Sequence, residues 1–179
     1  VFETKRAIKD GADEIDMVAN IPALKNKDYK LIQEDINAVK EAIGDHILKV
    51  IIELTLIDET EIKEISKTIE KTNADFIKTN TGFSGACKFN ELVTYLTIIR
   101  KYAPSKQIKA SGGINNFKTL NRVIAAGADR IGTSSGPKII DQLKLSSSNT
   151  EKNAPGIFDK KPKYKYPPPR NIDPAYQLG

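Results

Sequence analysis

A short unit occurs three times along this chain and limits the folds that it can adopt. The copies are GADEID at 11–16, NADFIK at 73–78 and GADRIG at 127–132. Each copy begins with a Gly or Asn, which suits the left-handed backbone just past a helix. The apolar run that follows suits a strand buried on both faces. Each copy therefore predicts the end of one helix and the start of one strand.

Two more strands follow the same rhythm, at 48–54 and 107–110, which makes five. Apolar residues at helical spacing predict helices between them, at 28–43, 58–71, 90–101, 117–126 and 137–145, with another at 3–9. Alternating strands and helices indicate parallel strands with right-handed crossovers, and hence an α/β fold. A closed (β/α)8 barrel needs eight such units in about 250 residues. If the fold is of this type, the chain holds five of the eight.

The composition is that of one globular domain. The chain has 179 residues, of which 39% are hydrophobic, and no apolar run approaches the roughly 18 residues that cross a bilayer. A single cysteine, Cys87, and a single histidine, His46, predict neither a disulfide framework nor a zinc site. His46 falls in a polar turn and Cys87 in a loop without a nearby histidine, so we expect neither to take part in chemistry.

The last 34 residues differ in character from the rest. Six of the nine prolines follow residue 146, together with more than half of the net charge of +5. We therefore expect a folded domain at 1–145 and a disordered Pro/Lys-rich tail at 146–179. Because the basic excess lies mainly on this tail, it does not indicate a nucleic-acid partner. The chain begins with Val1 rather than Met, which suggests processing or truncation at the amino terminus.

Charged side chains fall on strands where a buried layer would exclude them. They are Asp16, Lys49, Glu53, Lys78 and Lys109. A buried charge without a partner costs several kcal/mol, so these groups need one another or a ligand. Each alone is compatible with a structural salt bridge. Together, at the carboxyl ends of successive strands, they favour a site.

Lys78 and Lys109 carry the same charge on adjacent predicted strands. A lysine beside another cation in a dry pocket loses its proton more easily, and only the neutral amine attacks a carbonyl. The pair therefore suggests Schiff-base chemistry. Asp16 is a candidate carboxylate for proton relay, or a salt-bridge partner that neutralises Lys49 or Lys109.

Two glycine clusters suggest an anion site. Gly112 and Gly113 follow the fourth predicted strand, and the run from Gly132 through Ser134 and Ser135 opens the last helix. Such backbone approaches an anion closely, with helix amides and serine hydroxyls as donors. In α/β barrels the loops after the last two strands usually bind phosphate. The two clusters together favour a phosphate-binding site.

These segments resemble the deoxyribose-phosphate aldolase family of class I aldolases, which have a TIM-barrel fold. The matching stretches run in family order from residue 1 to about 145: GADEIDMV, LKVIIE, ADFIKTNTGF, IKASGGI and DRIGTSSG. The resemblance implies a partial TIM barrel that lacks the family's first three strands. It also implies reversible cleavage of 2-deoxyribose 5-phosphate to glyceraldehyde 3-phosphate and acetaldehyde, without a metal or an organic cofactor.

By motif position, the resemblance implies a role for each candidate. Lys78 is similar to the Schiff-base lysine, Lys109 to the neighbour that lowers its pKa, Asp16 to the relay carboxylate and Lys49 to an assisting residue. Gly112, Gly113, Ser134 and Ser135 are similar to the phosphate cradle, to which Gly132 belongs by position. Phe83 replaces a lysine that some members carry.

The expected partner is a small phosphorylated sugar, with no nucleic acid or membrane, in a cytoplasmic protein that forms a possible homo-oligomer. Two alternatives stay open. One is an inactive fragment or degenerate homologue that only binds a phosphorylated ligand, and the other is an interaction protein that works through its tail.

Overall fold

The computed structural model describes residues 1–85 and 87–148. Five strands and seven helices alternate along this part of the chain, with one 3-10 turn. The strands are β1 (Glu14–Val18), β2 (Ile47–Ile51), β3 (Phe76–Lys78), β4 (Gln107–Ser111) and β5 (Arg130–Gly132). The helices are α1 (Phe2–Lys9), α2 (Ile21–Lys25), α3 (Tyr29–Ile43), α4 (Glu59–Glu70), α5 (Phe89–Tyr102), α6 (Phe117–Ala125) and α7 (Gly136–Ser148), and the turn is η1 (Leu54–Leu56).

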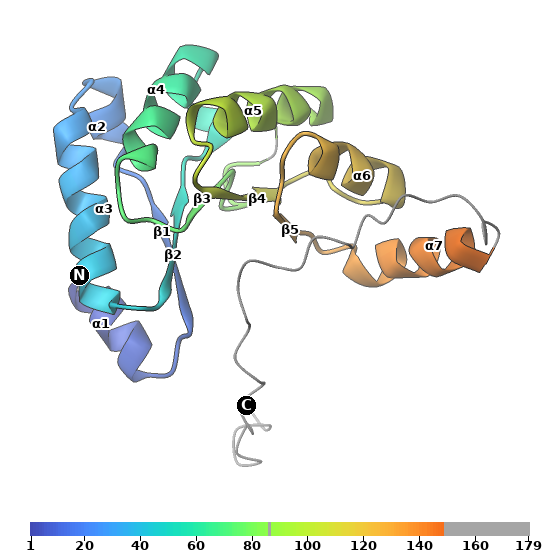
Figure 1. The fold of residues 1–179 in the computed structure, drawn as a ribbon, viewed down its shortest axis with the longest axis horizontal. Coiled ribbons are helices and arrows are strands. Elements are labelled where there is room, and N and C mark those ends of the chain that lie inside the picture. Colours follow the sequence, from blue (N-terminus) through green and yellow to red (C-terminus); the bar gives the residue numbers. More distant parts are fainter. Residues whose placement is uncertain (86, 149–179) are drawn as a thin grey trace.

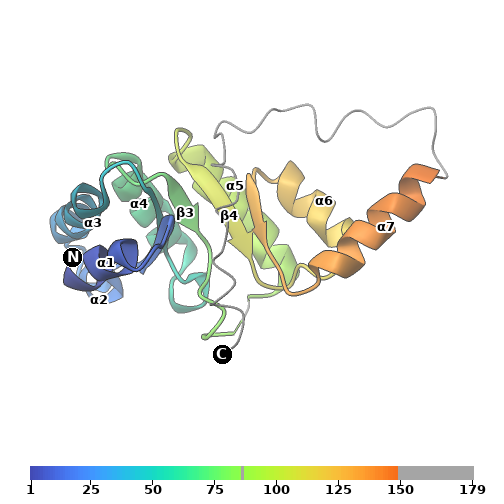
Figure 2. The same cartoon turned by 90° about the horizontal axis from the view of Figure 1, so that it is seen from below.

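All five strands are parallel and pair in chain order, β1-β2-β3-β4-β5. Helices α3 to α6 follow one another around the outside of the curved sheet (Figure 1). Figure 2 shows α1, α3 and α4 beside the first strands and α6 and α7 beside the last. The five predicted βα units are therefore confirmed, and they form a stretch of the wall of a (β/α)8-type barrel.

The apolar core lies between the sheet and the helices. Leu48 and Val50 of β2, and Ile52 directly after it, are fully buried toward the helices, because alternate residues of an extended chain share a face. Ile77, Ile108 and Ala110 continue this layer. The helical side of the layer consists of residues such as Ile32, Ile36, Ile62, Ile65, Leu96 and Ile99. The opposite, concave face of the sheet carries polar groups together with the buried side chains of Ile51 and Phe76.

The starts of α3, α4 and α6 agree with the predicted ones to within a residue, and each of the three carries a capping side chain. Asp28 accepts a hydrogen bond from the Leu31 amide at the start of α3. Asp58 and Glu61 form a reciprocal capping box at the start of α4. The short helix α2 was not predicted. It begins after Asn20, which caps it, and carries a proline in its first turn, where proline is tolerated.

Two element ends lie three residues from their predicted positions. The strand expected at 48–54 ends at Ile51, because Glu53 adopts a left-handed backbone with φ of 50° and turns the chain into η1. The last helix continues to Ser148 rather than ending at 145. The remainder of the predicted tail, 149–179, lies outside the described residues.

A clamp at the amino-terminal edge of the sheet joins the starts of β2 and β3 to α3. Asp75, just before β3, accepts a hydrogen bond from the Leu48 amide of β2 at 2.8 Å. Lys40 of α3 donates to Asp75 at 2.8 Å and to the His46 carbonyl at 2.7 Å. The three elements α3, β2 and β3 are thereby joined at one point.

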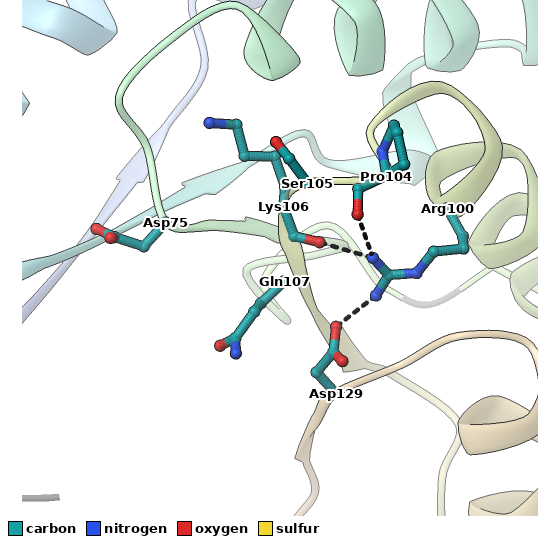
Figure 3. Close-up of a pocket in the computed structure, with 7 residues that line it drawn as sticks. All are labelled: Asp75, Arg100, Pro104, Ser105, Lys106, Gln107 and Asp129. Atoms are coloured by element: carbon teal, nitrogen blue, oxygen red, sulfur yellow. Dashed lines mark hydrogen bonds and ion pairs between the residues drawn. The ribbon is translucent and has the colours of Figure 1, made fainter. Parts of the chain in front are cut away.

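The same arrangement recurs two βα units further on, beside a polar cavity of about 420 Å³. Asp129, just before β5, accepts from the Ile108 amide of β4 at 2.9 Å. Arg100 of α5 donates to Asp129 and, at 2.7 Å, to the Lys106 carbonyl (Figure 3). The aspartate of the repeated sequence unit therefore has a structural role.

The lone cysteine and histidine lie apart from the strand ends. Burial raises the pKa of the half-buried Cys87 thiol, so it is less reactive at neutral pH. His46 lies in the turn before β2, with Nδ1 3.1 Å from the Asp13 carbonyl oxygen. Within the described residues, no helix is long and apolar enough to cross a membrane. No group of three or more His, Cys, Asp or Glu among them could hold a metal ion.

Candidate active site

The concave face of the sheet carries a cluster of charged side chains. The strand register places Lys49 beside Asp16, and Lys78 beside Lys109, which in turn pairs with Arg130. Parallel neighbours in register point to the same side of a sheet. Four of the five charges that the sequence singled out are therefore brought together: Asp16, Lys49, Lys78 and Lys109.

Asp16 is the centre of this cluster. One carboxylate oxygen, Oδ2, lies 2.7 Å from Lys78 Nζ and 3.7 Å from Lys109 Nζ. The other, Oδ1, accepts a hydrogen bond from Lys49 Nζ at 2.7 Å. Because the two amines of residues 78 and 109 share one carboxylate oxygen, they lie within mutual electrostatic influence. This is the proximity that the sequence argument requires.

Two further residues extend the cluster, and the sequence analysis did not assign them to the site. Glu14 Oε2 lies 2.6 Å from Lys49 Nζ and 2.6 Å from a guanidinium nitrogen of Arg130. Lys49 is the most buried member, with 3% of its side chain exposed. The available signal was the spacing of two between Glu14 and Asp16, which places both on one face of β1.

Glu53 does not belong to this cluster, contrary to the sequence prediction. Its buried carboxylate accepts hydrogen bonds from the Thr81 hydroxyl at 2.6 Å and from the Thr81 amide at 3.2 and 3.3 Å. The left-handed backbone at Glu53 turns it out of the strand alternation and toward the loop after β3. Glu53 therefore holds the loop that follows Lys78.

The two carboxylates of the cluster are ionised at neutral pH. Burial favours the neutral form of Asp16, but hydrogen bonds from Lys49 and Lys78 outweigh it and lower the Asp16 pKa to about 2. Burial also opposes ionisation of Glu14, whose pKa is nevertheless lowered by hydrogen bonds from Arg130 and Lys49. Both groups therefore act as fixed negative charges between the cations.

Among the cations, Lys109 has a pKa below its ordinary value. Burial contributes most, Asp16 opposes it, and the charges of Lys78, Lys49 and Arg130 lower the pKa further. The sequence analysis expected Lys109 to act on its neighbour. In the structure the pKa of Lys109 itself is lowered, so a larger fraction of this amine is neutral at a given pH than of an exposed lysine.

A cavity of about 490 Å³ opens at the carboxyl ends of β3, β4 and β5. Lys78 and Lys109 line it, together with all five residues of the predicted phosphate site: Gly112, Gly113, Gly132, Ser134 and Ser135. Lining residues that the sequence analysis did not predict include Thr81, Ser111, Asn115 and Thr133. Asp16 and Lys49 are not among the lining residues. The two amines and the glycine–serine loops thus face one space.

Two features of the backbone on the glycine–serine side of the cavity are compatible with anion binding. Gly112 and Gly113 have φ of 100° and 70°, a backbone conformation that residues other than glycine rarely adopt. Their positive φ turns the chain sharply after β4. Ser135 lies immediately before α7, a helix of 13 residues whose first amides lack helical partners.

Hydrogen bonds fix the strand ends that present these groups. Thr79 Oγ1 donates to the Ser111 carbonyl at 3.0 Å and accepts from the Ser111 amide at 2.9 Å. Asn80 Nδ2 donates to the same carbonyl at 3.0 Å, and Ser111 Oγ donates to the Asn80 carbonyl. The chain after Lys78 and the chain after Lys109 are therefore locked together.

The chain is similar to known proteins over most of its length. The model of the DeoC/LacD family aldolase matches residues 1–142. A protein of Staphylococcus aureus (strain MRSA252) named deoxyribose-phosphate aldolase 1 is 44% identical over 147 residues, which are 82% of this chain and 66% of that protein. The chain spans slightly less than two thirds of the length of such curated relatives.

Two solved structures show the same fold. One, described as QR15, an aldolase, is 35% identical with a TM-score of 0.73, over 83% of this chain and 66% of that one. The other is described as a unique tetrameric structure of deoxyribose phosphate aldolase from Aeropyrum pernix. It is 25% identical with a TM-score of 0.65, over 80% of this chain and 60% of that one.

Proposed function

The chain belongs to the DeoC/LacD family of aldolases, and on this basis we propose that its concave site cleaves 2-deoxyribose 5-phosphate reversibly to acetaldehyde and glyceraldehyde 3-phosphate. The observation that carries the proposal is the arrangement of Lys78 and Lys109 around one oxygen of Asp16. These amines share a cavity with the glycine–serine loops to which we assign phosphate binding. An imine-forming amine and a phosphate seat in one space fit a phosphorylated aldehyde.

Lys78 is proposed as the nucleophile. Its neutral amine adds to the C1 aldehyde of the open-chain sugar, and loss of water gives a protonated imine. Removal of the C3 hydroxyl proton then breaks the C2–C3 bond, and the bonding electrons enter the imine to form an enamine. Glyceraldehyde 3-phosphate leaves, C2 takes up a proton, and hydrolysis releases acetaldehyde and restores the amine of Lys78.

The neighbouring groups manage protons and charge in this scheme. Because the pKa of Lys109 is lowered, its amine is neutral in a larger fraction of molecules than that of an exposed lysine, and in this neutral form it is the proposed acceptor of the proton that Lys78 loses before attack. Asp16 stays ionised and pairs with the iminium cation as it forms. Lys49, buried beneath them, holds Asp16 through its Oδ1 atom so that Oδ2 faces the two amines.

Binding of the phosphate is proposed for the backbone around Gly112, Gly113 and Gly132 with the hydroxyls of Ser134 and Ser135. Phosphate held away from the reacting carbon supplies binding energy that orients C1 toward Lys78. A Cβ at Gly132 would lie 3.3 Å from Ser111 Cβ and 3.6 Å from Lys109 Cε, so glycine also leaves room for the lysine.

Assembly and location belong to the same proposal. We infer a homo-oligomer from the similarity to the solved structure described as tetrameric. A cytoplasmic location suits the reaction, because a phosphorylated sugar carries charge that keeps it from crossing a bilayer unaided.

Reductive trapping tests the proposed function. The full chain is incubated with acetaldehyde and borohydride, and peptide mapping by mass spectrometry locates the added ethyl group. We expect it on Lys78, and we expect Lys78→Met to abolish it. Lys106 is the internal control, because burial lowers the pKa of Lys106 as it does that of Lys109, but Lys106 lines the opposite cavity. Equal labelling of Lys106 would show that the reaction does not depend on the site around Lys78.

A second measurement separates catalysis from ligand binding. Release of glyceraldehyde 3-phosphate from deoxyribose 5-phosphate is followed with a coupled dehydrogenase. A folded protein that binds the sugar phosphate but shows neither trapping nor turnover would establish the binding-only alternative and refute the aldolase proposal.

A further inference from the structure

We propose that Glu14 and Arg130 are positioning residues that hold the buried Lys49, and through it Asp16, in place beneath the two reactive amines. This inference rests on the proposed function and extends it to two residues on the first and last strands of the described sheet. Neither residue lines the cavity at the strand ends, so both act through their neighbours rather than on the substrate.

The contacts form one continuous chain across the concave face. Arg130 of β5 donates to Glu14 Oε2 at 2.6 Å, and the same oxygen lies 2.6 Å from Lys49 Nζ. Lys49 donates to Asp16 Oδ1 at 2.7 Å. Each of these side chains is at least 70% shielded from solvent, which makes the ion pairs stronger than surface pairs.

Arg130 is itself held rigidly. Its guanidinium carbon lies 4.6 Å from the centroid of the buried Phe76 ring, which is a cation–π contact. Its strand position is in register with Lys109. The planar fork of an arginine allows it to stack on the ring and donate to a carboxylate in one geometry, which a lysine cannot reproduce.

The pair also sets the charge that surrounds Lys109. The groups that influence this amine come from every neighbouring strand: Asp16 from β1, Lys49 from β2, Lys78 from β3 and Arg130 from β5. Arg130 stays protonated at all relevant pH values, so it is a permanent cation beside Lys109. Glu14 offsets that cation and Lys49 together. Loss of Arg130 should therefore raise the pKa of Lys109, and loss of the Glu14 charge should lower it.

The test is the pH dependence of acetaldehyde trapping at Lys78 in four variants of the full chain. Glu14→Gln keeps an acceptor oxygen for both neighbours but removes the charge. The pKa of Lys109 should then fall, so the acid limb of the profile of trapping rate against pH should move to lower pH. Arg130→Met should move it to higher pH, by about 1 pH unit, with a roughly tenfold lower rate on the acid side. The double variant should return close to the wild-type limb.

Arg130→Lys separates charge from geometry. It retains a cation but loses the stacked fork, so we expect an unchanged limb and a lower maximal rate. Arg6→Met is the matched control, because Arg6 forms an exposed ion pair with Asp10 on α1 and should leave the profile unchanged. Circular dichroism of each variant reports whether it is folded, and Glu14→Gln is the substitution least disruptive to packing.

The outcomes distinguish this inference from the proposed function. A wild-type chain that is not labelled at Lys78 refutes the proposed function. A wild-type chain that is labelled, together with single variants whose limbs stay fixed or move in the same direction, overturns only the positioning role. Opposite shifts that cancel in the double variant support it, because a purely structural role would not move the limb with the sign of the charge.

Discussion

Replacement of Asp16 by Asn should destabilise the fold in a way that depends on pH. The carboxylate accepts hydrogen bonds from Lys49 and Lys78, and Asn keeps the shape while removing the charge. The Asp16 pKa falls from its ordinary 3.8 to about 2 on folding. This difference corresponds to roughly 2 kcal/mol of stability. Because 29% of the side chain is exposed, solvent screening reduces our expectation to about 1 to 1.5 kcal/mol.

The sign of the pH dependence follows from the lowered pKa. A carboxylate with a lower pKa in the folded state stabilises the protein above its unfolded pKa of about 4, and this stabilisation is lost as the pH falls through about 2. We therefore expect the midpoint of unfolding at pH 7 to lie at a higher urea concentration for wild type than for Asp16→Asn. The difference in unfolding free energy between them should shrink steadily below about pH 5.

The assay is urea unfolding followed by circular dichroism in a series of buffers from neutral to acid pH. Asp10→Asn is the matched control, because Asp10 pairs with Arg6 on the exposed face of α1 and should change stability little. A difference between wild type and Asp16→Asn that stays constant across the series would refute the reasoning, since it would show that the charge of Asp16 is not what stabilises the cluster.

Two further predictions concern Lys109 and the amino-terminal clamp. Lys109→Leu removes the proposed proton acceptor, so the rate of trapping at Lys78 should fall about 100-fold at neutral pH and recover toward high pH. An undiminished rate at pH 7 would contradict that role. Gly127→Ala places a Cβ 3.1 Å from Arg100 Nε at a φ of 108°, and urea unfolding should show a loss of about 2 to 3 kcal/mol. Gly11→Ala has a similar φ of 104° with nothing within 4 Å and should lose only about 1 kcal/mol; equal losses would show that crowding of Arg100 contributes nothing.

Much of the fold could be predicted because local signals and tertiary packing agree. Asp28 and Asp58 mark helix starts by the chemistry of capping, and the structure uses both in that way. The end of β2 could not be predicted, because it depends on the hydrogen bond that the Thr81 hydroxyl, in a distant loop, donates to the carboxylate of Glu53. The helix α2 was not predicted, because Pro22 usually indicates a helix break. In the structure Pro22 lies in the first turn of the helix, which Asn20 caps.

The candidate site divides in the same way. Lys78 and Lys109 could be singled out because charges on otherwise apolar strands are rare and both fall at strand ends. Glu14 and Arg130 could not, because their pairing depends on the curvature that brings the first and last strands of the sheet within reach of each other. The position of Lys49 beneath Asp16 likewise depends on the strand register, which spacing alone does not provide.

The contact between Glu14 and Arg130 joins residues 116 positions apart in sequence, and this separation has a consequence for folding. Contacts between residues so distant in the chain form late in folding, because closing the long loop between them costs conformational entropy before the contact can stabilise the fold. During synthesis the earlier strands emerge and can begin to pair before Arg130 leaves the ribosome. The cluster around Asp16 is therefore complete only when β5, which follows the other four described strands in sequence, adds Arg130. A chain synthesised only as far as β4 carries Lys78 and Lys109 without the pair of Glu14 and Arg130.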